Sequence, residues 1–503
     1  MSIWKLFLIA LLSSVSTLAD ARNLFNSTIN TNDLAGNIVE DYDSSGMQRV
    51  FLEKNIQTVP SQGRNGQASK QKNILSQKML NKPNTIYVIQ YNYELNDEKI
   101  EIPDNCILEF DGGCIDHGTL VGKNTGINAG LYKIFGEDVT ISGSWNIENL
   151  HVCWFGLRSN EPGLDFGTSF TNIISKTQNI TQNTYWSQGY YYGGIKYKLS
   201  QGVYYNKSTV SLEHGNILSN WTLEGYSKGS TIIINQNSKQ PVFFLLDSRK
   251  ESRRNWIIRD VVFRENDGIH IFQPASTILE NCYFLGCRNA IQYEMTINTI
   301  IRNCTFLSCQ QGIRYTGSEG MGPSTTYYIE HCAFNHCGRA INATVKNNNN
   351  RIYLDVRDSY IEYSTGYGFY LSSNRDDENA IIVNFSNCFF EGNTDYLQYG
   401  ARTSFVNCFK DYTTDEAFKV AQNSFGYGSF SWIGSITPKV EGSLSSINLF
   451  ITEHRAGKKN ERPSSLGSSN IGFQYFDTTL GKPIYWTGIK WVDALGNPVE
   501  ISE

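Results

Sequence analysis

Three side chains that could perform acid–base and charge-stabilising chemistry, His270, Glu294 and Arg314, lie on successive copies of one repeated strand. A carboxylate or an imidazole can take up a proton, and a guanidinium can neutralise an anionic substrate group. Because successive copies stack, we expect these three side chains to converge, and we predict them as the catalytic residues. Further acids lie on connections beside this strand and are predicted to bind substrate: Glu319, Asp376 and Asp377.

The outward positions of the repeated strand form two columns across its copies. The first column contains His270, Gln292, Arg314, Asn342 and Tyr370, and the second contains Phe272, Glu294, Thr316, Thr344 and Ser372. Hydrogen-bonding groups with rings at both ends suit an uncharged or mildly acidic sugar chain. We therefore predict Gln292, Asn342, Tyr370 and Phe272 as substrate-binding residues. The alternative is an ordinary solvated face.

Whether this face cleaves a sugar chain is left open by the sequence. Hydrolysis takes two carboxyl groups about 5–9.5 Å apart, and Glu294 is the only acid on the inferred strand face. A lyase instead needs a base together with a group that neutralises a uronate. If the protein is an enzyme, we expect a polysaccharide lyase or a glycoside hydrolase, with no cofactor.

The element that must position these residues is a repeat of irregular length between residues 255 and 410. Seven copies resemble Glu280-Asn281-Cys282-Tyr283-Phe284, with the Cys position at residues 261, 282, 304, 332, 359, 388 and 408. A repeat of 20–29 residues indicates stacked supersecondary units. An eighth, earlier copy begins at Asn220.

Each copy carries Asn, Asp or His immediately before the Cys position: residues 260, 281, 303, 331, 358, 387 and 407. These residue types adopt the left-handed backbone conformation most readily among non-glycine residues, so we expect a sharp bend at each. Short strands separated by such bends predict an all-β fold, a right-handed parallel β-helix. An antiparallel sandwich would need hairpin turns and would not repeat the same inward residue type.

Three Cys pairs share a C-x₄-C spacing: Cys282/Cys287, Cys304/Cys309 and Cys332/Cys337. A metal array is one interpretation, but zinc sites usually combine closer pairs with His partners. Val261 and Ser359 occupy the same position in other copies, which favours a ladder of free, buried cysteines. We predict no metal site.

The composition agrees with an all-β protein of 503 residues. Charged residues make up 18% and aromatic residues 13%, with 43 Gly, which excludes a disordered chain and argues against a helical bundle. The net charge is −5 without a basic run, so nucleic acid is not expected as a partner.

The two ends of the chain differ from its centre. Lys5, the apolar run 6–12 and Ala19-Asp20-Ala21 form a signal-peptide pattern over residues 1–21, which predicts a secreted or cell-surface protein. The alternative is a hydrophobic segment that is retained. We expect an arm or linker over 22–83, an N-terminal β region over 84–154, the β-helix over 155–410, a β connection over 411–460 and an aromatic module over 461–503.

Residues 155–234 resemble the opening of the pectate-lyase-like (rhamnogalacturonase/epimerase-type) β-helix superfamily. The resemblance lies in Asp165–Ile173, which is similar to a family helix, and in Leu199–Tyr204 and Leu223–Ile233, which are similar to family strands. Similarity extends over roughly 90–410 and implies the fold and a polysaccharide or cell-surface glycan as the partner. The motifs of family polygalacturonases are absent, since no Gly-His-Gly follows Asp376-Asp377 and Asn393-Thr394-Asp395.

The C-terminal stretch Gly472–Asp493 resembles short aromatic β modules that close tail-fibre and tail-spike proteins of phages and prophages of gut Bacteroides-type bacteria. It predicts a three-strand meander with turns at Leu480-Gly481 and Thr487-Gly488, whose aromatic residues form either a core or a sugar-stacking surface. The resemblance implies a homotrimer, phage tail components as partners and a virion location. The signal peptide favours a secreted bacterial enzyme instead, and a purely structural or adhesive β-helix is the third alternative.

Overall fold

The computed structural model describes residues 41–42, 46–61, 68–181, 185–187, 190–192, 194–213, 221–246, 256–272, 275–316, 325–345, 351–373, 380–399, 401–411, 418–420, 425–433, 440–441, 447–451, 456–463, 466–468 and 471–499. The chain divides into two compact units, Met1–Arg49 and Val50–Glu503. In the first, β1 (Asp41–Tyr42) pairs antiparallel with the start of β2 (Gln48–Phe51). The predicted signal peptide lies outside the described residues.

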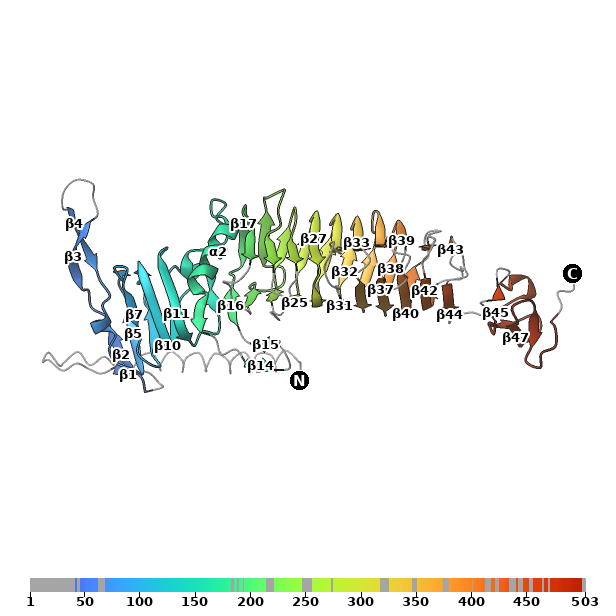
Figure 1. Ribbon diagram of the computed structural model, residues 1–503, viewed down its shortest axis with the longest axis horizontal. Coiled ribbons are helices and arrows are strands. Elements are labelled where there is room, and N and C mark those ends of the chain that lie inside the picture. Colours follow the sequence, from blue (N-terminus) through green and yellow to red (C-terminus); the bar gives the residue numbers. More distant parts are fainter. Residues whose placement is uncertain are drawn as a thin grey trace, which may run out of the picture. The chain divides into compact units, whose positions relative to one another are not determined.

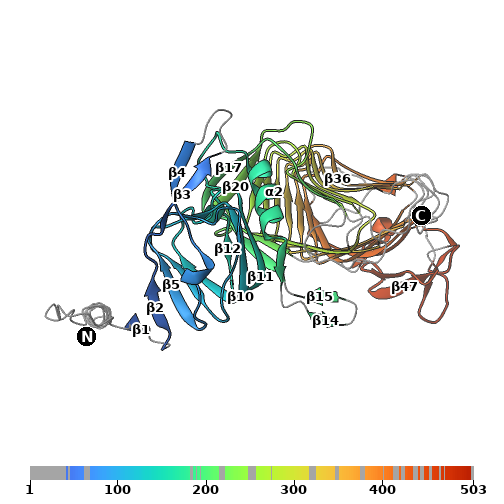
Figure 2. The same cartoon turned by 60° about the vertical axis from the view of Figure 1, so that its left-hand side comes forward.

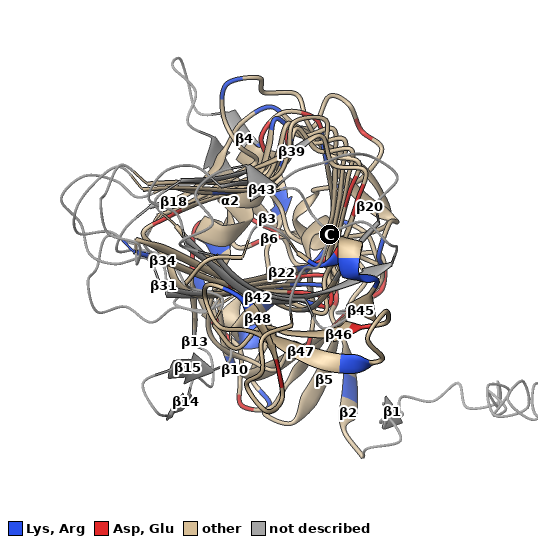
Figure 3. Ribbon diagram, turned by 90° about the vertical axis from the view of Figure 1, so that its right-hand side faces the viewer, with Lys and Arg blue, Asp and Glu red and all other residues tan. Residues whose placement is uncertain are grey.

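The second unit contains a right-handed parallel β-helix, as the sequence predicts. Between residues 195 and 399, each coil contributes one strand to each of three parallel stacks, and the strands lie rung on rung in Figure 1. Seen end on in Figure 3, strands of the third stack (β18, β39) face strands of the first (β31, β34), and β20 of the second stack closes one side.

The strands of the three stacks follow one another in chain order. The first stack consists of β12 (Leu150–His151), β16 (Ile195–Lys198), β19 (Trp221–Glu224), β22 (Trp256–Arg259), β25 (Ala275–Glu280), β28 (Ile297–Arg302), β31 (Thr325–Glu330), β34 (Ile352–Arg357), β37 (Ile381–Ser386), β40 (Arg402–Asp411), β42 (Phe425–Ile433) and β44 (Ile447–Ile451). The second consists of β17 (Gly202–Asn206), β20 (Thr231–Asn235), β23 (Val262–Arg264), β26 (Tyr283–Leu285), β29 (Thr305–Leu307), β32 (Ala333–Asn335), β35 (Tyr360–Glu362) and β38 (Phe389–Glu391). The third consists of β18 (Val210–Glu213), β21 (Phe243–Leu246), β24 (Ile269–Phe272), β27 (Asn289–Glu294), β30 (Gln311–Thr316), β33 (Arg339–Val345), β36 (Tyr367–Ser373), β39 (Asp395–Tyr399), β41 (Phe418–Val420) and β43 (Val440–Glu441).

The predicted bends separate the first stack from the second. The backbone is left-handed there, with φ between 49° and 60°, at Asp260, Asn281, Asn303, His331, Asp358 and Asn387. Asn407 differs, because β40 runs through it as one strand. Asn220 lies outside the described residues.

A second left-handed corner, which the sequence analysis missed, separates the second stack from the third. It follows the first corner by five residues in each of these six coils, with φ between 49° and 65°, at Glu265, Gly286, Ser308, His336, Tyr363 and Gly392. Its residue types vary, so no single-letter pattern marks it. The two corners explain the C-x₄-C spacing, because each Cys follows one corner directly.

The cysteines form two buried columns, as predicted. All eleven are free, and all but Cys114 are buried. The Cys304 Sγ donates to the Leu279 carbonyl of the preceding coil at 3.6 Å. Burial raises the pKa of Cys282 and Cys304 well above the ordinary thiol value, so these side chains act as small apolar groups with a weak donor.

Stacked aromatic rings fill the coil beside the cysteines. Phe263, Phe284, Phe306 and Phe334 lie on successive rungs with ring centroids 5.2, 5.0 and 4.5 Å apart. The rings are parallel within 10°. Such large buried apolar groups supply most of the free energy that holds the coils together.

Coils with the same corner precede the predicted repeat. Asn84, Asn105 and Asn124 have φ of 51°, 57° and 54°, and each precedes a fully buried residue. Here β8 (Ile107–Phe110) pairs in parallel with β5 (Thr85–Ile89) and with β10 (Gly118–Ala129). Strand β10 also pairs with β7 (Lys99–Glu101) and with β11 (Val139–Trp145), and β11 pairs with β13 (Asn179–Thr181). Within the expected linker, β3 (Ile56–Ser61) and β4 (Ala68–Asn73) form a hairpin, and Leu52, Leu75 and Leu80 join the core.

Helix α2 (Phe166–Thr177), expected from the family resemblance, covers the start of the third stack (Figure 2). Phe166 and Phe170 are fully buried, and their rings contact Phe243 of β21. Asp165 caps the helix by accepting a hydrogen bond from the Thr168 amide at 3.1 Å. The helix therefore seals the hydrophobic interior where the third stack begins.

The C-terminal module contains the predicted antiparallel meander of β46 (Gln474–Asp477), β47 (Lys482–Trp486) and β48 (Trp491–Asp493), and β45 (Ala456–Gly457) adds a fourth strand. Gly481 and Gly488 occupy the two turns with positive φ. Tyr475 and Trp491 pack with Ile484 as a separate core. Of the two alternatives, a core or a sugar-stacking surface, these two aromatic residues therefore belong to a core.

None of the helices in the described ranges is long and apolar enough to cross a membrane.

Candidate functional site

The outward columns predicted from the sequence exist in the third stack. His270 is opposite Gln292, Gln292 opposite Arg314, Arg314 opposite Asn342, and Asn342 opposite Tyr370. The second column is equally in register and contains Phe272, Glu294, Thr316, Thr344 and Ser372. We call this outward surface the third-stack face.

His270 and Glu294 come together, as predicted, and Gln292 joins them. The Gln292 amide donates to Glu294 Oε1 at 2.6 Å. His270 Nε2 lies 3.3 Å from Glu294 Oε1 and 3.3 Å from Gln292 Nε2. The hydrogen bond from His270 lowers the pKa of Glu294 against the opposing effect of burial, so Glu294 is a carboxylate at neutral pH. It is therefore suited to accept a proton or a hydrogen bond rather than to act as a general acid.

The sequence analysis predicts that Arg314 converges with this pair, but the structure shows no hydrogen bond or ion pair between them in the described ranges. It lies one rung beyond, opposite Gln292, and forms no ion pair with Glu294 among the described residues. The described neighbours in contact with the Glu294 carboxylate are His270 and Gln292.

The far end of the third-stack face is more closed than the sequence suggested. Asn342 is only 3% exposed, and its amide donates to Gln311 Oε1 at 2.7 Å. Arg339 covers the ring of Tyr370, with the guanidinium carbon 4.1 Å from the ring centroid. Asn342 therefore bonds to a neighbouring side chain, and a cation covers the ring of Tyr370. Phe272 is partly exposed, and Glu319, Asp376 and Asp377 lie outside the described residues.

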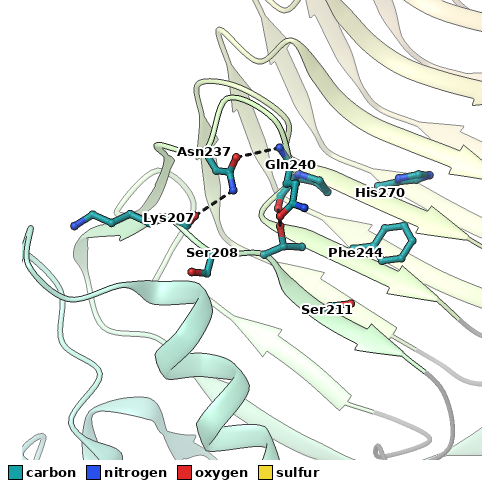
Figure 4. A pocket seen from close by; sticks show the side chains of 9 residues that line it. Lys207, Ser208, Ser211, Asn237, Gln240, Phe244 and His270 are labelled. Carbon is teal, nitrogen blue, oxygen red and sulfur yellow. Dashed lines mark hydrogen bonds between the residues drawn. The ribbon is translucent and has the colours of Figure 1, made fainter.

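A pocket of about 590 Å³ opens where the third-stack face begins (Figure 4). Its lining comes from two loops and from the outward residues of the first three strands: Lys207, Ser208, Thr209, Ser211, Asn237, Gln240, Pro241, Phe244 and His270. Ser211, Phe244 and His270 belong to one column, since Ser211 is opposite Phe244 and Phe244 opposite His270. His270 therefore joins the pocket to the cluster around Glu294.

Sequence analysis missed every residue of the pocket except His270. The repeat alignment places its first third-stack strand after Gly268, and the two coils just before it, which supply β18 and β21, lack the Asn-Cys pattern. One pattern in the sequence could have extended the third stack to the pocket. Phe243-Phe244-Leu245-Leu246 alternates inward and outward in register with Ile269–Phe272.

Comparison with protein families gives a match over this region. Residues 158–314 match the family model described as rhamnogalacturonase A/epimerase, pectate lyase-like. The pectate-lyase-like resemblance is confirmed. The matched stretch contains α2, the pocket and the His270–Glu294 pair. No curated protein matches the chain.

Among solved structures, the chain is similar to ORF18 of Geobacillus virus E2, at 13% identity with a TM-score of 0.36, covering 57% of this chain and 62% of that one. It is also similar to tailspike protein 3 of bacteriophage CBA120, at 15% identity with a TM-score of 0.30, covering 70% of each chain. A mannuronic acid specific polysaccharide family 6 lyase from human gut microbiota matches at 11% identity with a TM-score of 0.31, covering 72% of this chain and 86% of that one. The chain thus spans less than two thirds of the viral ORF18 protein.

Proposed function

We propose that this protein binds a polysaccharide or cell-surface glycan along the third-stack face. The observation that carries the proposal is the in-register column from Ser211 to Arg314, which begins in the 590 Å³ pocket and presents aromatic, amide and guanidinium groups at regular rung spacing. A rigid polar groove with a few aromatic rings suits a polymer of sugars. The pectate-lyase-like family match supports the same class of ligand.

The biological setting we favour is recognition of host glycan by a tail-spike-like protein of a phage or prophage, at the virion tail. The aromatic C-terminal module supports it. The signal-peptide pattern supports instead a secreted bacterial lyase or hydrolase, and a structural or adhesive β-helix is a third setting. Tail and baseplate genes beside this gene would support the first setting, whereas glycan-uptake genes would support the second.

Binding is tested by affinity electrophoresis of the whole protein in gels that contain one of a panel of capsular and plant polysaccharides. We expect at least one polysaccharide to retard the protein. Because Arg314 is unpaired among the described residues and can meet an anionic or hydroxyl group, Arg314→Ala should weaken this retardation about tenfold. Arg264→Ala is the matched control, since its side chain is 49% exposed and belongs to the second stack rather than to the third-stack face.

Depolymerisation is a second candidate function, favoured by the His270–Glu294 pair. A carboxylate held ionised by an imidazole can act as a general base. Glu294→Gln should then abolish the release of reducing ends or unsaturated uronates while binding persists. If the unmodified protein releases neither product from any polysaccharide that it binds, the face is a binding surface only. If no polysaccharide retards the protein, the proposed function is wrong.

A further inference from the structure

The pocket at the start of the third-stack face is built from a fixed hydrogen-bond network rather than from loose loops. The Thr209 hydroxyl lies 3.0 Å from Gln240 Oε1 and 2.9 Å from the Pro241 carbonyl oxygen and shares its one proton between these acceptors. The Asn237 side-chain amide donates to the Lys207 carbonyl at 3.1 Å, and its Oδ1 accepts from the backbone N–H of Gln240 at 3.2 Å, as Figure 4 shows. The network holds the two loops together and fixes the orientation of the Gln240 side chain. A ligand would therefore meet a preorganised site.

The lining of this pocket carries little net charge. No carboxylate is among the lining residues, and the one permanent cation, Lys207, is turned away from the pocket (Figure 4). Its Nζ donates to the Pro162 carbonyl at 3.1 Å. His270, the remaining titratable group, lies 3.3 Å from the carboxylate of Glu294, which balances any positive charge on the imidazole. What remains for a ligand is a set of hydroxyl and amide groups.

Phe244 supplies an apolar surface beside these polar groups. Its side chain is only partly buried, although it belongs to a sheet whose inward positions are fully buried. The ring meets that of His270 edge to face at a centroid distance of 5.1 Å. A partly exposed ring held in place by its neighbour is a platform for the C–H face of a sugar ring.

We infer that the pocket is a subsite for one uncharged sugar residue of the bound glycan, stacked on Phe244 with its hydroxyls facing the amide of Gln240. The inference rests on the proposed function and deepens it, because it specifies that the glycan has an uncharged sugar unit at this position. A uronate is disfavoured here, since its carboxylate would be desolvated without a cation to meet it. Acidic groups of the same glycan would instead lie nearer Arg314 and Arg339, farther along the face.

The test compares matched neutral and acidic probes on the whole protein. Saturation-transfer NMR is recorded with the methyl glycosides of glucose, galactose, mannose and N-acetylglucosamine, and with methyl glucuronate and galacturonate glycosides that bear free carboxylates. We expect at least one neutral glycoside to bind and the acidic ones to bind at least tenfold more weakly. Phe244→Ala should remove the neutral signal and weaken polymer retardation about tenfold, whereas Phe244→Trp should retain both.

Tyr360→Ala is the matched control, because Tyr360 is an aromatic residue 54% exposed on the second stack. The inference is overturned if acidic glycosides bind in the pocket as tightly as neutral ones. It is also overturned if Phe244→Ala leaves polymer retardation unchanged while Arg314→Ala weakens it, an outcome that preserves the proposed function. If neither variant changes the retardation, both the subsite and the proposed binding face are wrong.

Discussion

Asp165 connects the helix cap to the pocket. Its carboxylate accepts hydrogen bonds from the Thr168 amide at 3.1 Å and hydroxyl at 2.6 Å, and from the amides of Lys207 and Ser208 at 2.6 and 3.2 Å. Partial burial opposes ionisation, but these hydrogen bonds outweigh it and lower the pKa of Asp165 to about 2. One side chain therefore holds both the first turn of α2 and a loop that lines the pocket.

Replacement of Asp165 should destabilise the protein in a pH-dependent way. We expect Asp165→Ala to lower the free energy of unfolding by about 2 kcal/mol at pH 7, since a helix cap and two loop contacts are lost. A depressed pKa gives stability that is complete above the unfolded value near 4 and is lost as pH falls towards 2. Urea unfolding at several pH values measures the difference. A difference that stays constant down to pH 2 would contradict the assignment.

The buried cysteine columns make a prediction about thiol reactivity. Because ten of the eleven cysteines are buried, Ellman's reagent should react quickly with no more than one thiol per native chain, Cys114. In guanidinium chloride all eleven thiols should react without prior reduction. Fewer than eleven would reveal a disulfide, and rapid reaction of several native thiols would show that the columns are open to solvent.

Among the structural elements, the left-handed corners decide where each strand turns. Asn281 has a φ of 53°, which glycine adopts freely and alanine does not. Asn281→Ala should therefore cost about 1–2 kcal/mol, whereas Asn281→Gly should change stability by no more than about 0.5 kcal/mol. The midpoints of urea denaturation of the two variants measure this. Equal midpoints would mean that the corner tolerates any residue.

Strands of the first stack carry an alternating column of charges next to these corners. The column is in register across seven coils: Lys198, Glu224, Arg259, Glu280, Arg302, Glu330 and Arg357. Glu224, whose side chain is 14% exposed, accepts from Lys198 at 2.6 Å and from Arg259 Nε at 2.8 Å. Burial opposes its ionisation, but these two partners prevail and lower its pKa.

Replacement of Glu224 by lysine should place three cations on successive rungs, because Lys198 and Arg259 are its neighbours in the column. We expect Glu224→Lys to destabilise the protein by about 2–3 kcal/mol, because like charges directly opposite one another repel and the partly buried partners lose their hydrogen bonds. Glu265→Lys is a control, since Glu265 is 52% exposed and lies outside the column. The melting temperatures of the two variants are compared. Equal shifts would mean that the column contributes nothing specific.

On the scale of the whole molecule, the tail-spike-like setting predicts a homotrimer. Light scattering of the full chain should then give three times the monomer mass of 56.9 kDa. The expectation has a physical basis in the apolar outward residues of the second stack, where Leu285 and Leu307 are 36% and 39% exposed on adjacent rungs. A monomeric mass at micromolar concentration would reject the trimer and favour the secreted-enzyme setting.

The sequence by itself determined the coil. A bend residue before each inward side chain, repeated seven times, specifies both the strand period and the register, because a slip of one residue would turn Cys282 and Phe284 outward. That is why the columns from His270 to Tyr370 and from Phe272 to Ser372 could be predicted residue by residue. The turn and strand pattern of residues 472–493 also predicted the C-terminal meander, whereas α2 was expected from the resemblance of Asp165–Ile173 to a family helix.

Only the tertiary structure decided how the outward side chains combine. Register fixes which residues are opposite, but not which of them bond: Gln292 holds Glu294, Arg314 remains apart, and Asn342 is covered. The second corner and the pocket escaped prediction for a related reason. The corner accepts several residue types, and the pocket joins Asn237 and Gln240 to Thr209 and His270 across coils whose loops share no motif. Contacts between coils depend on where long side chains and loops find partners, and that information is spread over residues far apart in the chain.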